Sequence, residues 1–174
     1  MKMRGILPVA LTLCCLACFD LATTSVHAQN NIVIFGSGKD STLPYKTRTK
    51  RPGARLNTYS FFAPLPSNKA VAELQVIYPQ GFRGIFDDSV EIVNRRTQKK
   101  YDIQETIVDK EVGSTRFVFK EAIAGAPSNE LELIVRGISN PSDTGMYRVQ
   151  VQALGTEANP LFKYLGQWLV DIYN

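Results

Sequence analysis

The sequence predicts an all-β domain, an immunoglobulin-like sandwich of two antiparallel sheets. Apolar and polar residues alternate with a period of two in several short segments, which is typical of strands that bury one face. Turn-forming residues separate these segments, and no long amphipathic helix pattern occurs. In addition, Asp143-Thr144-Gly145 precedes Tyr147, which is typical of the tyrosine corner of such sandwiches. A small β-barrel is the alternative that these observations leave open.

In the first half of the chain we expect strands at 31–35, 56–62 and 71–78. The first is an apolar run that two glycines stop, and the second is rich in aromatic residues and is ended by prolines. The third alternates cleanly, so Ala72 and every second residue after it are expected to face the core. The basic stretch 39–55 has neither a strand nor a helix period, and we expect a loop that crosses between the sheets.

The middle of the chain is predicted to contain a hairpin with a charged tip. Residues 89–93 and 100–103 are its expected strands, and 94–99 are its turn. Residues 115–119 follow as the next strand, with two phenylalanines on one side.

The last three expected strands are 130–138, 147–153 and 165–173, and all three alternate. In the tyrosine corner, the Tyr147 hydroxyl is expected to bond the backbone a few residues upstream. Val149 stands where an antibody domain has a cysteine, so we expect it to be packed in the core.

The N-terminal segment has the pattern of a secretory signal peptide. Lys2 and Arg4 precede an apolar run at 6–18, and the small residues before the next segment predict cleavage after Ala28. The run is shorter than the roughly 20 residues that a membrane span needs. A lipoprotein signal that retains Cys18 fits less well, because Cys15 stands where an aliphatic residue is expected. We therefore expect export to the periplasm or outside the cell.

Removal of residues 1–28 leaves one predicted domain, 29–174, without any cysteine or histidine, because Cys14, Cys15, Cys18 and His27 are all removed. This domain cannot hold a disulfide, a cysteine nucleophile, a Ser-His-Asp triad or a zinc site built on Cys or His. Its net charge of +3 is below that of a dedicated nucleic-acid binder, so no nucleic-acid partner is expected.

Clustered basic residues are the best indication of a partner. They lie in the stretch after the first strand and at the predicted hairpin tip: Lys46, Arg48, Lys50, Arg51, Arg55, Arg95, Arg96, Lys99 and Lys100. If both segments lie at one end of the sandwich, they form an anion-attracting patch. Acidic polysaccharide, lipid headgroups or an acidic envelope protein are the expected partners. The alternative is solvated loop charge that keeps the protein soluble.

The other motifs are weaker evidence for a function. The Gly36-Ser37-Gly38-Lys39 turn lacks the earlier glycine of a phosphate-binding loop, and Asp40 replaces its Ser or Thr, so no nucleotide is expected. Asp87, Asp88 and Asp143 could be calcium ligands, but they lack the spacing of a calcium loop and fit turns and strand caps better, so no metal or other cofactor is expected. Tyr45, Phe82 and Phe86, on predicted loops, are candidates for a sugar-stacking platform. No pair of carboxylates stands out, and we expect no enzymatic activity; a hydrolase that uses two carboxylates on envelope polysaccharide is the alternative function.

Several short motifs, spread over almost the whole predicted domain, occur together in order: Phe35 to Tyr45, Arg51 to Arg55, Ala72-Glu73-Leu74, Tyr78-Pro79, Gly137 to Pro141, Gly145-Met146-Tyr147 and Tyr164-Leu165-Gly166. With these motifs the sequence resembles a family of exported cyanobacterial proteins grouped as a domain of unknown function. The resemblance implies a signal peptide and one β-rich domain, and a periplasmic or extracellular location. It also implies that the loop at 36–55 is a feature of the family. It implies no catalytic residues.

Overall fold

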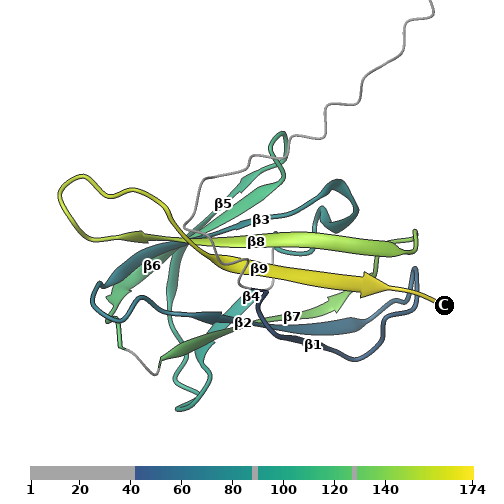
Figure 1. The fold of residues 1–174 in the computed structure, drawn as a ribbon, viewed down its shortest axis with the longest axis horizontal. Coiled ribbons are helices and arrows are strands. Elements are labelled where there is room, and N and C mark those ends of the chain that lie inside the picture. The colour runs from purple at the N-terminus through teal and green to yellow at the C-terminus, as the bar shows by residue number, and fades with distance from the viewer. Residues whose placement is uncertain (1–41, 88–89, 127–128) are drawn as a thin grey trace, which may run out of the picture. The chain divides into compact units, whose positions relative to one another are not determined.

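The computed structural model describes residues 42–87, 90–126 and 129–174. Within these ranges nine strands form two antiparallel sheets, as Figure 1 shows, and the only helical element is one 3-10 turn, η1 (Gln80–Phe82). The prediction of an immunoglobulin-like β-sandwich is confirmed. The predicted strand at 31–35 and the glycine turn after it lie outside the described residues.

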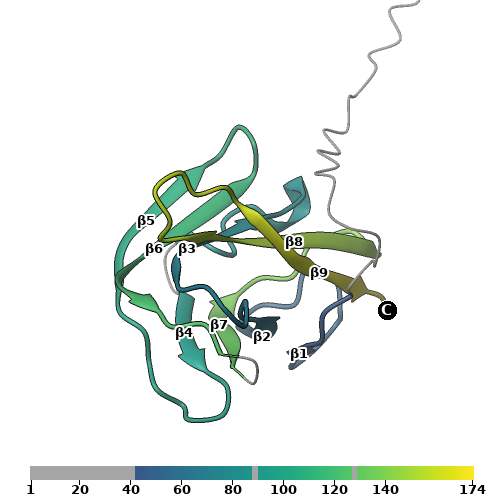
Figure 2. The ribbon, with the colours of Figure 1, turned by 60° about the vertical axis from the view of Figure 1, so that its left-hand side comes forward.

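The two sheets pack as layers, which Figure 2 shows one above the other. The first sheet has the order β1 (Tyr45–Thr47), β2 (Asn57–Pro64), β7 (Glu130–Ile138) and β4 (Val90–Asn94). The second has the order β5 (Ile103–Asp109), β6 (Ser114–Ile123), β3 (Val71–Ile77), β8 (Gly145–Gly155) and β9 (Lys163–Ile172). Apolar residues of both inner faces meet between the layers and form the core.

Aromatic side chains fill the centre of the core. Tyr59 and Phe61 of β2 stack with ring centroids 5.4 Å apart, and Phe61 contacts Trp168 of β9 at 4.9 Å. The Trp168 indole N–H also donates to the Phe62 carbonyl at 2.9 Å, so this bond links the two sheets directly. A buried Trp needs such a partner for its only donor.

Strand β3 departs from the predicted alternation at its start. Leu74 and the apolar residues two and four positions later are buried as predicted, but Val71 is buried in place of Ala72. The pairing register shifts between Val71 and Glu73, which marks a bulge. A bulge adds one residue to one strand and thereby reverses the facing of the residues before it.

Two predictions about loops and strands are wrong. Residues 45–47, expected in a loop, form β1, because the Tyr45 ring packs against the rings of Tyr59 and Phe61 beside the edge of β2. The strand expected at 100–103 begins only at Ile103 and continues to Asp109 as β5, an edge strand with mostly exposed residues. Neither segment has the clean alternation that a half-buried strand shows.

The hairpin tip itself is present. Asn94 donates its backbone N–H to the Lys99 carbonyl at 2.8 Å, and Tyr101 donates to the Ile92 carbonyl at 2.9 Å. After these two bonds the chain leaves the first sheet and enters the second as β5. The predicted turn at 94–99 therefore also makes the crossing between the sheets.

The tyrosine corner is confirmed. The Tyr147 hydroxyl donates to the Asp143 carbonyl at 2.8 Å, four residues upstream. Val149, two residues further along β8, is fully buried and pairs in register with Trp168. The core valine and the neighbouring indole thus fill the space that a disulfide occupies in antibody domains.

Two of the three candidate residues for a sugar-stacking platform lie in the core instead. Phe82 and Phe86 are fully buried, since η1 and the turn after it fold back onto the core. Phe82 packs between Tyr59 and Tyr147, with centroids 6.2 and 5.2 Å away. Tyr45 is half-buried against β2, so it offers no free ring face of the kind expected.

Candidate anion-binding site

The basic loop, defined here as residues 48–56, connects β1 to β2. Arg48, Arg51 and Arg55 are exposed, and no ion pair in the described part of the chain includes any of them. The sequence has no Asp or Glu between Thr42 and Ala72 to neutralise them. Three guanidinium groups are thereby available to an external anion.

The side chain of Asn57, the residue directly after the loop, fixes the loop by hydrogen bonds. Its side chain is fully buried, and its amide N–H groups donate to the Thr49 carbonyl at 2.9 Å, the Thr47 hydroxyl at 2.9 Å and the Asn140 side-chain oxygen at 2.5 Å. Its own side-chain oxygen accepts from the backbone N–H groups of Thr58 and Thr49. One amide therefore satisfies the main chain at both ends of the loop.

Asn140 completes the network from the turn between β7 and β8. It donates its side-chain N–H to the Arg51 carbonyl at 2.8 Å and its backbone N–H to the Ala54 carbonyl at 2.9 Å. Its side-chain oxygen also accepts from the Tyr59 hydroxyl at 2.9 Å, and burial raises the pKa of Tyr59 to about 12. The loop backbone is thus fixed while its three arginine side chains remain in solvent.

Lys50 differs from the three arginines because its ammonium already contacts two tyrosine rings. Its ammonium lies 5.7 Å from the Tyr45 ring centroid and 5.4 Å from that of Tyr173. Burial by itself lowers the pKa of Lys50, but the Tyr45 hydroxyl, with Tyr173 and Asp171, raises it above its ordinary value on balance. The Tyr173 backbone N–H donates to the Lys50 carbonyl at 3.0 Å, so this residue fastens the end of the chain to the loop.

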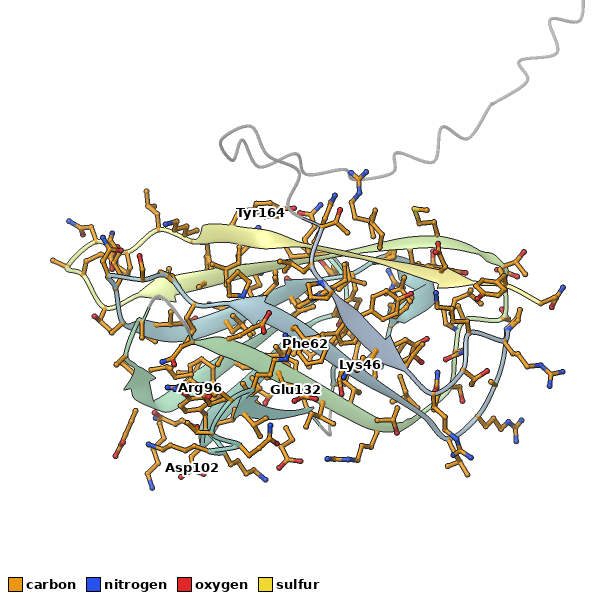
Figure 3. The ribbon with its side chains drawn as sticks, turned by 60° about the horizontal axis from the view of Figure 1, so that its bottom comes forward. Lys46, Phe62, Arg96, Asp102, Glu132 and Tyr164 are labelled. Atoms are coloured by element: carbon orange, nitrogen blue, oxygen red, sulfur yellow. The ribbon has the colours of Figure 1, made fainter. Side chains whose placement is uncertain are left out.

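Lys46 and the hairpin-tip residue Arg95 meet on the outer face of the first sheet. The Arg95 guanidinium lies 4.2 Å from the Phe62 ring centroid, and the Lys46 ammonium lies 5.7 Å from it. Figure 3 shows Lys46 and Arg96 on either side of Phe62. Arg95 also pairs with Glu130. These two cations therefore cover an aromatic ring of the sheet and are less available to a ligand than exposed arginines.

The other cations of the hairpin tip differ in whether they form an ion pair. The Lys100 ammonium lies 3.6 Å from Glu91, a carboxylate that also accepts from Arg136 at 2.6 Å. Arg96 and Lys99 are exposed, and no ion pair of the described residues includes them. The tip therefore offers two free cations beside a local acid.

The basic loop and the hairpin tip lie at opposite ends of the first sheet. Asn57, directly after the loop, pairs with Ile138, whereas Asn94, at the start of the tip, pairs with Leu131 at the far end of β7. The 8 residues of β2 separate these ends by roughly 23 Å. The nine basic residues therefore do not form one patch. Among the described residues, only the loop places together three arginines that have no ion pair.

A shallow groove opens between β4 and the start of β5, and Glu91, Lys100, Tyr101, Asp102 and Lys120 are among the residues that line it. Hydrolysis of a glycoside by two carboxylates needs one acid with a raised pKa. Hydrogen bonding from Arg136 and the charge of Lys100 instead lower the pKa of Glu91. Glu91 is thus held ionised and does not suit the role of the acid that protonates the leaving group.

The charged residues of the loop were predicted from the sequence, but the asparagines that fix it were not. Asn57 and Asn140 are 83 positions apart, and neither stands in a motif that marks a buried network. Asn140-Pro141 has only the signature of a turn.

The described residues thus define a two-sheet β-sandwich that presents a fixed cationic loop at one end. The chain belongs to the family described as "Protein of unknown function (DUF2808)", whose model matches residues 32–172. A search of the curated proteins finds no match. Among the described residues, no helix has the length and apolar character needed to cross a membrane.

Three solved structures are similar in fold. The bacterial hydrophobin BslA is 12% identical with a TM-score of 0.48, and the match covers 79% of this chain and 99% of that one. The human F-spondin reeler domain is 11% identical at 0.40, covering 78% and 93%. The collagen-binding domain of a Staphylococcus aureus adhesin is 12% identical at 0.40, covering 77% and 99%. Such distant similarity says nothing about the function of this chain.

Proposed function

We propose that this protein is an exported, non-catalytic binding module whose basic loop binds anionic groups of the cell envelope. The observation that carries the proposal is the arrangement of Arg48, Arg51 and Arg55: exposed, unpaired and mounted on a backbone fixed by Asn57 and Asn140. Carboxylate, phosphate and sulfate groups all match the planar, two-pronged donor geometry of a guanidinium.

The fixed backbone supports binding rather than mere solubility. A loop that is already ordered loses little conformational entropy when a ligand arrives, so more of the interaction energy remains as affinity. Cations that serve only solubility need no such support, because they function equally well on a mobile loop. The two free cations of the hairpin tip, Arg96 and Lys99, form a second and weaker candidate patch.

The test is retention of the full-length protein on immobilised dextran sulfate, a polyanion without a specific sequence or shape. Substitution of Arg48, Arg51 and Arg55 together by Ser is expected to lower the salt concentration needed for elution by about half, since three of the contacts are lost. The matched control replaces Lys110, Lys120 and Lys163 by Ser. This removes the same charge from exposed residues that form no ion pair within the described ranges.

Equal elution of the two triple variants would show that net charge alone governs binding, and the proposal would fail. A third variant, Arg96→Ser with Lys99→Ser, separates the hairpin tip from the loop. We expect it to elute close to the unsubstituted protein.

The exported location is a further part of the proposal, supported by the signal pattern of residues 1–28 and by the resemblance to exported cyanobacterial proteins. We expect a mature N-terminus at Gln29 in protein recovered from the periplasm or the medium. N-terminal sequencing and intact mass measure this directly. An unprocessed chain in the cytoplasm, or a lipid attached at Cys18, would contradict it.

A further inference from the structure

Large apolar side chains protrude beside the basic loop. Five are exposed within the described ranges, and three of these, Leu56, Met146 and Tyr173, are 71%, 66% and 56% exposed. The other two, Val112 and Leu161, lie on separate connections, between β5 and β6 and between β8 and β9. Exposed apolar residues that gather in one region indicate a surface for a partner.

All three lie at the same end of the sandwich as the loop. Leu56 is the last residue of the loop itself, and the Tyr173 backbone N–H bonds the Lys50 carbonyl. Met146 pairs with Asp171, two residues before Tyr173. Figure 1 shows this end, where the connection from β1 to β2, the start of β8 and the C-terminus lie together.

The conformation of Leu56 also points to a role outside folding. Its φ of 55° lies in the left-handed region, where Gly and Asn are favoured over Leu. A leucine here neither suits its backbone nor reaches the core. Such strain at an exposed residue is a reason to look for a ligand that contacts it.

Cations and protruding apolar side chains together match an anionic bilayer better than a soluble polyanion. At a membrane surface, arginines meet headgroup phosphates while Leu, Met and Tyr side chains enter the boundary with the acyl chains. A polysaccharide offers the charge but no apolar layer. Two carboxylates, Asp143 and Asp171, also lie at this end, but the four cations of the loop outnumber them.

We propose that this end of the sandwich docks on a bilayer that contains anionic lipid. The arginines of the basic loop contact the headgroups, and Leu56, Met146 and Tyr173 enter the interface. This inference rests on the proposed function and names its partner: the anionic groups are those of lipids in a membrane surface.

The test is co-sedimentation of the full-length protein with vesicles of phosphatidylcholine, with and without phosphatidylglycerol, in parallel with the dextran sulfate column. The apolar variant carries Leu56→Asn and Met146→Ser and keeps Tyr173, because the Tyr173 ring contacts the Lys50 ammonium of the basic loop. Asn suits the left-handed backbone at position 56, so the loop is kept in shape. We expect this variant to bind anionic vesicles about tenfold more weakly, while its retention on dextran sulfate is unchanged.

The arginine variant is expected to lose anionic-vesicle binding on the order of a hundredfold, since each surface cation contributes near an anionic membrane. Equal vesicle binding by the apolar variant and the unsubstituted protein would overturn the docking inference and leave anion binding by the loop intact. Retention on dextran sulfate without any vesicle binding would do the same, and would identify a polysaccharide as the partner. If the arginine variant behaved normally on both supports, the proposed function itself would fail.

A tryptophan probe locates the contact. The chain has one tryptophan, Trp168, which is fully buried and gives a constant background. Leu56→Trp is expected to shift its emission to shorter wavelength with anionic vesicles and to become protected from acrylamide. Leu161→Trp is the matched control, because Leu161 is 83% exposed on the connection at the other end of β8 and β9. Equal shifts at both positions would overturn the inference.

Discussion

Two buried asparagines, Asn57 and Asn140, decide the shape of the proposed binding surface. They are buried and carry no charge, yet their amides bond the main chain of the basic loop on both sides. The arginines were predicted from the sequence because a run of charge is visible in it. The network was not, because its two members come together only when β2 and β7 pair.

Asn140→Ala tests the network. The substitution removes a side chain that accepts from Asn57 and Tyr59 and donates to the Arg51 carbonyl. The buried Tyr59 hydroxyl then loses its hydrogen-bond acceptor, and the Asn57 amide loses one of its three acceptors. We expect the free energy of unfolding to fall by about 2 to 3 kcal/mol. Chemical denaturation measures it, with Asn159→Ala on an exposed turn as the control. Equal midpoints for the two variants would mean that the network does not hold the loop.

Tyr147→Phe tests the corner bond to the Asp143 carbonyl. Loss of one hydrogen bond at a partly exposed hydroxyl is expected to destabilise the protein by about 1 kcal/mol. The same change at Tyr173, whose hydroxyl has no hydrogen bond among the described residues, is expected to have little effect. An unchanged unfolding midpoint for Tyr147→Phe would show that the corner contributes nothing to stability.

Tyr59 gives the protein a dependence on alkaline pH. Burial raises its pKa to about 12, so the folded state keeps the phenol proton while the unfolded chain ionises above pH 10. The unfolded state then binds fewer protons, and stability falls as the pH rises from about 10 to 12. The loss is expected to be on the order of 2 kcal/mol. Tyr59→Phe should flatten this part of the stability curve; an equally steep fall in that variant would assign it to other groups.

At the scale of elements, the bounds of a strand were predicted best from the sequence where one face of the strand is buried. Residues 130–138 form β7 with the predicted bounds, because the buried residues Leu131, Leu133 and Val135 stand at every second position. The two missed strands, β1 and β5, are edges of their sheets. An edge strand with both faces partly in solvent needs no alternation, so its sequence contains no period to detect.

The edge position of β5 has a measurable consequence. It pairs only with β6, whereas β3 is paired on both sides by β6 and β8. We expect the amides of β5 that face away from β6 to exchange with deuterium at least tenfold faster than those of β3. Hydrogen exchange read by mass spectrometry resolves the two segments. Equal protection would mean that another part of the protein covers this edge.

At the scale of the whole molecule, the sequence predicted the class of fold and the charged segments but not their arrangement. The basic loop and the hairpin tip were expected to share a patch if both lay at one end. Pairing in the first sheet places them at opposite ends instead. Distances between loops depend on which strands pair and in which register, and neither follows from local alternation. The loop therefore stands alone as the main cationic surface.

The most direct test of this account is to map where a polyanion touches the protein. Backbone amide shifts of the isotopically labelled protein, followed by NMR during titration with a short dextran sulfate, report contacts residue by residue. We expect the largest changes at residues 48–56, smaller changes at 94–100, and none in the Arg48, Arg51 and Arg55 triple variant at the loop. Changes centred on the hairpin tip, or spread evenly over all basic residues, would contradict the claim that the basic loop is the binding surface.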